Sequence, residues 1–123
     1  MYSIRFRSDL NLLDIAWSAQ FTPDEVANYA RDLKARFVAE GFRPGYRLRM
    51  DMSDSAVQPQ EALAAFQANM SDFPKASRIA IVTPSVIARM QVRRIMTQPY
   101  LRIFAQAEPA LVWLLDERAI VPA

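Results

Sequence analysis

The sequence has no cysteine and no histidine, and only two of its 123 residues are glycine. Without cysteine there is no disulfide and no thiolate. Without histidine the commonest general base and the commonest transition-metal ligand are missing. Gly41 and Gly45 lie in one turn, so a glycine-rich loop for a phosphate group is excluded. These absences argue against an enzyme, a metal site and a bound cofactor.

Long apolar runs are also missing, because no segment approaches the length that spans a bilayer. Near the N-terminus, Arg5, Arg7 and Asp9 interrupt the apolar stretch that a secretory signal needs. We therefore expect a cytoplasmic protein without membrane insertion. The length is that of one ordinary domain, and no repeat or linker divides it, so we expect a single domain over residues 1–123.

Lysine is scarce, and the formal net charge of +2 is too small to indicate a nucleic-acid partner. Lys34 and Lys75 are the only lysines, so 15 − 2 = 13 basic residues are arginine. Arginine is suited to pairing with carboxylate and phosphate groups through two parallel hydrogen bonds. A GC-rich genome would give the same bias without any functional cause.

What the chain does contain is a regular succession of strand and helix patterns. Alternation of apolar and polar residues, or a short apolar run, predicts strands over 2–7, 13–18, 46–53, 79–82 and 100–105. Helical spacing of apolar residues predicts helices over 22–40, 59–70, 84–96 and 109–117, the first opened by a capping box at Thr22 and Glu25. This order predicts an α/β fold with a mixed, largely parallel sheet, in which a first hairpin supplies the antiparallel edge.

Several segments resemble a known family in both order and sequence. They are Asp51-Met-Ser53 at the end of the third strand, Arg78-Ile-Ala-Ile-Val82, Leu101-Arg-Ile-Phe104 and Glu108-Pro-Ala-Leu-Val-Trp-Leu114. Over nearly the whole chain this order resembles the STAS domains, the SpoIIAA-like fold of anti-sigma-factor antagonists. The resemblance implies the order β-β-α-β-α-β-α-β-α with helices mainly on one face of the sheet. It also implies a non-enzymatic regulatory domain that binds a protein partner.

The resemblance implies a switch in the loop after the third strand, where antagonist members carry a phosphorylated serine that controls binding to a kinase-like anti-sigma factor. Asp51 and Ser53 match the strand-end Asp-x-Ser pattern, and Ser55 matches the acceptor serine in approximate position. Independently, Ser53, Asp54 and Ser55 follow the carboxyl end of a strand, where open α/β sheets place their sites. The alternative is that these side chains only cap nearby backbone amides.

Asp51 has a second interpretation as the phosphorylated aspartate of a receiver domain, with Thr83 as the hydroxyl after the fourth strand. The acidic pair that holds Mg²⁺ in receiver domains has no counterpart in this chain, and neither has their lysine. Without a cation to offset the charge, an acyl phosphate at Asp51 is disfavoured.

The predicted third helix is apolar on two sides. One side carries Ala88, Val92, Ile95 and Met96, and the nearly opposite side carries Val86, Ile87 and Met90. Such a helix is either sandwiched in the core or leaves a patch for a partner. Methionine and arginine are enriched in interfaces. The candidate surface for a protein partner or a homodimer is therefore Ile87, Arg89, Met90, Arg93 and Arg94.

Two further surfaces come from the strands and the aromatic residues. Arg5 and Arg7 on the first strand and Arg47 and Arg49 on the third point to one face of the sheet, which predicts a basic face for an anion or an acidic partner. The alternative is cross-strand pairing, such as Arg49 with Asp14. No exposed aromatic residues interleave with these arginines, so RNA binding is not expected.

A different class of function follows if the aromatic residues line a pocket. Trp17, Phe66 and Trp113 would then lie between the sheet and the helices and bind a small ligand or a lipid. The alternative is that the three side chains simply fill the core.

Overall fold

The structure is a computed structural model that describes residues 1–55 and 57–116. In this part of the chain, five strands form one sheet in the order β1-β2-β3-β4-β5. The strands are β1 (Tyr2–Arg7), β2 (Leu12–Ser18), β3 (Arg47–Asp54), β4 (Arg78–Val82) and β5 (Leu101–Phe104). β1 runs antiparallel to β2, and the other three run parallel to β2. The predicted mixed, largely parallel sheet with an antiparallel first hairpin is confirmed.

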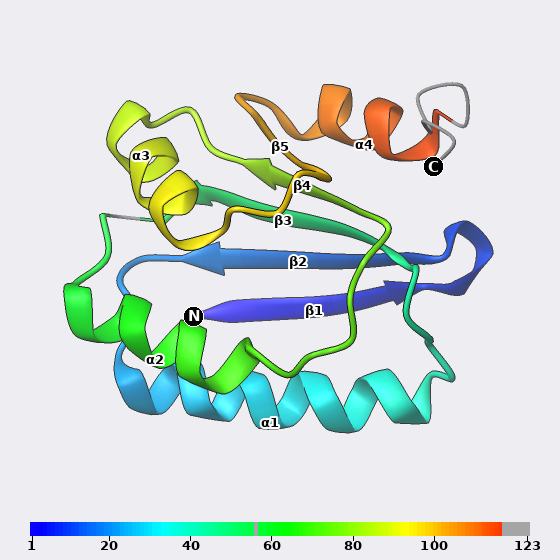
Figure 1. Ribbon diagram of the computed structural model, residues 1–123, viewed down its shortest axis with the longest axis horizontal. Coiled ribbons are helices and arrows are strands. Elements are labelled where there is room, and N and C mark those ends of the chain that lie inside the picture. The colour runs from blue at the N-terminus through cyan, green and yellow to red at the C-terminus, as the bar shows by residue number, and fades with distance from the viewer. Residues whose placement is uncertain (56, 117–123) are drawn as a thin grey trace.

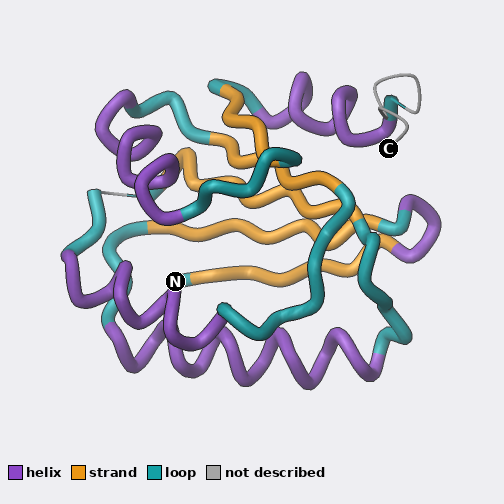
Figure 2. Tube along the Cα trace, in the orientation of Figure 1, coloured by secondary structure: helices purple, strands orange, loops and turns teal. Residues whose placement is uncertain are grey.

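The helices of the described residues are α1 (Pro23–Ala39), α2 (Gln60–Met70), α3 (Val86–Ile95) and α4 (Ala107–Leu115). Buried residues of α1, α2 and α3 belong to the core on one face of the sheet and those of α4 to the core on the other. In the view of Figure 1 and Figure 2, α1 and α2 run along one side of the molecule and α4 along the other. The element order and the placing of the helices mainly on one face agree with the prediction. The predicted end of the last helix at Glu117, and the tail after it, lie outside the described residues.

Two of the described helices, α1 and α3, start at a side-chain cap. At α1 the Thr22 hydroxyl accepts a hydrogen bond from the Glu25 amide, as the capping box predicted. At α3 the cap is Ser85, one residue after the predicted start of the helix at residue 84: the Ser85 hydroxyl accepts from the Ala88 amide at 3.1 Å. Thr83 instead accepts a hydrogen bond from the Ser85 amide, which shapes the turn before the helix. The boundary moves because the helix begins at the hydroxyl nearest its first free amides.

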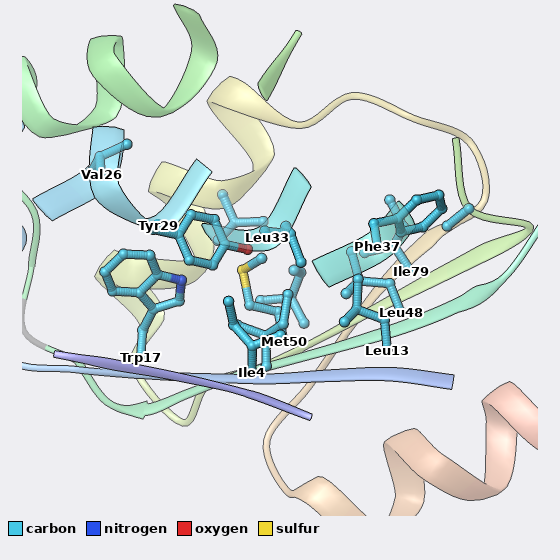
Figure 3. Packing of buried hydrophobic residues seen from close by; sticks show 14 of the residues in the cluster. Ile4, Leu13, Trp17, Val26, Tyr29, Leu33, Phe37, Leu48, Met50 and Ile79 are labelled. Carbon is cyan, nitrogen blue, oxygen red and sulfur yellow. The ribbon is translucent and has the colours of Figure 1, made fainter. Parts of the chain in front are cut away.

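The main core lies between the sheet and helices α1, α2 and α3. Figure 3 shows Trp17 of β2 and Met50 of β3 pointing from the strands toward Tyr29 of α1, with Leu33 and Phe37 further along the same helix. Aromatic rings meet closely there, with the centroids of Trp17 and Tyr29 4.6 Å apart. The inward positions of the first two strands are those that the alternation predicted.

A smaller core lies on the opposite face, beneath α4. Because successive side chains of a strand point to opposite faces, Leu12, Ala80 and Val82 point away from the main core. They pack against Ala110 and Leu114 of α4. β4 is consequently buried at all five positions, which confirms it as a central strand covered on both sides.

Arginine side chains from the sheet bind the backbone of α4. Arg47 donates from Nε to the Leu114 carbonyl at 2.8 Å, and Arg78 donates from Nη1 to the Trp113 carbonyl at 2.7 Å and the Asp116 carbonyl at 2.9 Å. These carbonyls belong to the last turn of the helix and its cap, where intrahelical donors are missing and the helix dipole favours positive charge. α4 is therefore fixed by charged hydrogen bonds as much as by its small core.

This arrangement predicts unequal effects for two arginines that both contact Trp113. Arg78 and Arg102 lie over the Trp113 ring at 5.2 Å and 5.4 Å, but only Arg78 is buried and donates to the α4 backbone. We expect Arg78→Leu to lower the free energy of unfolding by about 2–3 kcal/mol, because two carbonyls lose their donor. Arg102→Leu should lower it by less than about 1 kcal/mol. Urea denaturation of both variants measures this, and equal losses would contradict the role of the Arg78 hydrogen bonds.

Candidate interaction site at the carboxyl edge of the sheet

Parallel pairing brings three loops to one edge of the sheet. Strands β2, β3 and β4 all end there, so the segments leading into α1, α2 and α3 lie next to one another (Figure 1). Both surfaces that the sequence singled out for a partner, the loop after β3 and helix α3, belong to this edge. Open α/β sheets place their sites at this position.

Gln58 joins two of these loops through its side chain. Its Oε1 accepts a hydrogen bond from the Phe21 amide at 2.8 Å, and its Nε2 donates to the Ala19 carbonyl at 3.1 Å. The residue is only 4% exposed, so both bonds are sheltered from water. The sequence analysis missed Gln58, because a single glutamine in a polar loop carries no pattern that distinguishes it from a solvated one.

Gln91 of α3 joins the same loop to the helix. Its Oε1 accepts from the Gln58 amide at 3.2 Å, and its Nε2 donates to the Gln58 carbonyl at 3.0 Å. One side-chain amide thus satisfies both backbone groups of one residue, as a neighbouring strand would. The loop after β3 and the middle of α3 are therefore linked directly, although residues 58 and 91 are far apart in the sequence.

The loop between β2 and α1 contributes a strained residue to this network. Ala19 has a φ of +61°, in the left-handed region that costs a non-glycine residue about 1–2 kcal/mol. Its amide donates to the Asp54 carbonyl at 3.0 Å, and its carbonyl accepts from Gln58. The surrounding hydrogen bonds keep the backbone in this conformation.

The predicted switch loop divides into bonded and free side chains. Asp51 Oδ1 accepts from the Ser53 amide at 2.9 Å, and the Ser55 hydroxyl donates to the Trp17 carbonyl at 3.0 Å. Asp51 thus caps a nearby backbone amide, whereas the Ser55 hydroxyl bonds a carbonyl of β2. Ser53 and Asp54 are exposed, and their side chains make no hydrogen bond or ion pair with the rest of the described chain.

Helix α3 is buried on one side and exposed on the other. Ala88 and Val92 face the core, whereas Val86, Ile87 and Met90 are 72%, 58% and 57% exposed. Of the two alternatives for this helix, the structure therefore shows the one with an exposed apolar side. Beside these residues lie three arginines whose side chains have no partner among the described residues. We name this surface the α3 patch: Val86, Ile87, Arg89, Met90, Arg93 and Arg94.

The expected basic face of the sheet is corrected in part. Arg49 forms a bidentate pair with Asp14, with Nη2–Oδ2 at 2.6 Å and Nε–Oδ1 at 3.0 Å, and this hydrogen bonding raises the pKa of Arg49. Arg47 donates to the carbonyls of Leu10 and Leu114. Both guanidinium groups therefore have internal partners beneath α4, so they offer no open row of cations. Arg5 stays exposed, and Arg7 is half-buried beside Asp9.

A cavity of about 50 Å³ lies between the sheet and helices α2 and α3. Trp17 and Phe66 line it, as the ligand hypothesis expected, together with Met50, Val92 and Met96. Trp113 does not, because it lies on the opposite face of the sheet, against Phe104; its place in this pocket was wrongly predicted.

Residues 1–55 and 57–116 contain no group of three acidic side chains that could hold a metal ion. No helix there combines the length and apolar character needed to cross a bilayer.

Similarity to known proteins lies in the fold. No protein-family model matches the sequence, and no curated protein matches it. The structure is similar to an uncharacterized DUF3478-family protein with a SpoIIAA-like fold from Shewanella loihica PV-4, with a TM-score of 0.70 and 15% identity over 93% of this chain and 92% of that one. It is also similar to an anti-sigma factor antagonist from Mycobacterium paratuberculosis, with a TM-score of 0.65 and 13% identity over 94% and 96% of the two chains. The SpoIIAA-like fold predicted from the sequence is confirmed.

The linking role of Gln58 predicts a measurable loss of stability. Gln58→Ala leaves the Phe21 amide and the Ala19 carbonyl without partners, so we expect the free energy of unfolding to fall by about 2–3 kcal/mol. The Phe21 amide should also exchange its hydrogen faster. Gln60→Ala, at an exposed position two residues away, is the matched control and should change stability by less than about 0.5 kcal/mol. Unchanged exchange at Phe21 in Gln58→Ala would contradict the assignment.

Proposed function

We propose that the protein is a non-enzymatic regulatory domain, a single STAS-like unit over residues 1–123 that acts in the cytoplasm by binding a protein partner. The partner binds the α3 patch and the adjoining loop of Ser53, Asp54 and Ser55. The observation that supports this proposal is the exposed apolar side of α3, bordered by arginines that have no partner within residues 1–55 and 57–116. Large exposed apolar side chains that cluster on one helix mark interaction surfaces. The fold likeness to an anti-sigma factor antagonist adds support.

The loop is proposed to regulate this binding through phosphorylation at Ser53. Its hydroxyl is exposed and has no partner among the described residues, whereas the Ser55 hydroxyl is bonded to the Trp17 carbonyl. A phosphate would add about −1.5 to −2 charges beside Asp51 and Asp54. The repulsion changes the loop, and the Gln58–Gln91 hydrogen bonds transmit that change to α3.

Partner capture tests the α3 patch. Immobilised protein is incubated with a lysate of its own host, and we expect a specific protein to be retained by the wild type and lost with Ile87→Asp or Met90→Asp. A new carboxylate at the centre of an apolar contact should weaken it at least about tenfold. Val38→Asp on α1 is the matched control, because Val38 is also exposed, at 78%, but lies outside the patch. Equal capture by all variants would refute the patch as the partner surface.

Phosphosite mapping tests the switch. After incubation with host lysate and ATP, we expect phosphate on Ser53 in the wild type and none in Ser53→Ala. Ser55→Ala should keep the modification, because the Ser55 hydroxyl faces the protein interior. A lack of phosphate on both serines would remove the switch from the proposal while leaving the partner surface in place.

The second candidate function, binding of a small apolar ligand, is supported by the cavity between sheet and helices. At about 50 Å³ it is smaller than the ~150 Å³ apolar cavity known to admit benzene, so a larger ligand requires movement of α3. This candidate predicts a retained small molecule in native mass spectra of protein purified from its host. Ala88→Leu, which adds bulk to the cavity wall, should remove it.

A further inference from the structure

Helix α4 carries a second apolar surface that nothing in the described chain covers. Ala110 and Leu114 face the sheet, so the positions on the other side of the helix point outward. Val112 is 64% exposed there. It shares this side with Glu108, four residues before it, and Leu115, three residues after it, and we name these three residues the α4 face.

The α3 patch and the α4 face carry opposite charges. The α3 patch contains Arg89, Arg93 and Arg94 and no acidic residue. The α4 face contains Glu108 and no basic residue, and Arg102 lies beside it over the Trp113 ring. Complementary charge of this kind selects one partner surface over others.

The order of apolar and charged residues along the two helices also matches. In α3 the apolar residues come first and Arg93 and Arg94 end the helix, whereas in α4 Glu108 comes first and the apolar residues follow. Placed antiparallel, the arginines meet Glu108 while Val86 and Ile87 meet Val112 and Leu115. The lengths agree, since Val86 to Arg94 spans about 12 Å and Glu108 to Leu115 about 10 Å at 1.5 Å per residue.

A single molecule cannot make this contact, because α3 and α4 pack against opposite faces of the sheet. Pairing of α3 with α3 of another copy is unfavourable as well. A parallel pair would place arginines against arginines, and an antiparallel pair would place them against the first turn of α3, which has no acidic residue.

We propose that the protein associates with itself through a heterologous contact, in which the α3 patch of one copy binds the α4 face of a second copy. The inference goes beyond the proposed function, because self-association covers the surface that a protein partner would need. A heterologous contact of this type closes into a ring or continues as a chain.

Mixing of two variants tests the contact. Ile87→Asp blocks the α3 patch and Val112→Asp blocks the α4 face, so each alone should self-associate at least about tenfold more weakly than the wild type. Mixed, they should form a complex, because one supplies an intact α4 face and the other an intact α3 patch. Light scattering over a range of concentrations measures this, with Val38→Asp as the control that behaves like the wild type.

Exchange of the two opposite charges tests the same contact independently. Glu108→Arg and Arg94→Glu should each weaken the association, and the double variant should recover it, since the charges are again opposite.

A monomeric wild type at all concentrations, persistent association of Val112→Asp alone, or a mixture that forms no complex would overturn the proposal. Val112→Asp leaves the α3 patch intact, so partner capture by this variant tests the proposed function separately.

Discussion

The carboxyl edge of the sheet depends on one buried amide. Gln58 lies where three loops meet, and its side chain and backbone together bond to the loop before α1 and to Gln91 of α3. A buried polar group of this kind is costly unless every donor and acceptor has a partner, so the geometry of all three segments is set jointly. A surface assembled from these segments therefore changes as a unit.

The two faces of the sheet are covered by different physical means. On the main face, aromatic and aliphatic side chains supply a continuous apolar core. On the other face, five small or aliphatic residues form a minor core, and arginines bind the α4 carbonyls. α4 is therefore held in place partly by its backbone, and Val112 remains exposed on its outer side. α3 also has an exposed outer side, since it buries only Ala88 and Val92.

Most of the fold is predictable from the sequence, because burial of one side of each strand or helix sets the period of its apolar residues. The exposed side of α3 was recognisable as an unusual second apolar stripe. The roles of Gln58 and Gln91 were not, because their partners are backbone atoms of other segments, and backbone atoms leave no trace in residue type. Arg47 and Arg49 were misjudged for a related reason: α4 is apolar nearly all round, so its sequence does not indicate which face of the sheet it covers.

The outer strands β1 and β5 each leave one row of backbone amides and carbonyls without a neighbouring strand in the described sheet. Such edges invite pairing with other chains and lead to aggregation unless they are short or charged. β5 has only four residues and carries Arg102, and β1 carries Arg5 and Arg7. Any strand that pairs with β1 or β5 must remove water from these guanidinium groups. A basic strand is also repelled by their positive charge. The arginines of β1 thus help to keep the sheet from adding a further strand.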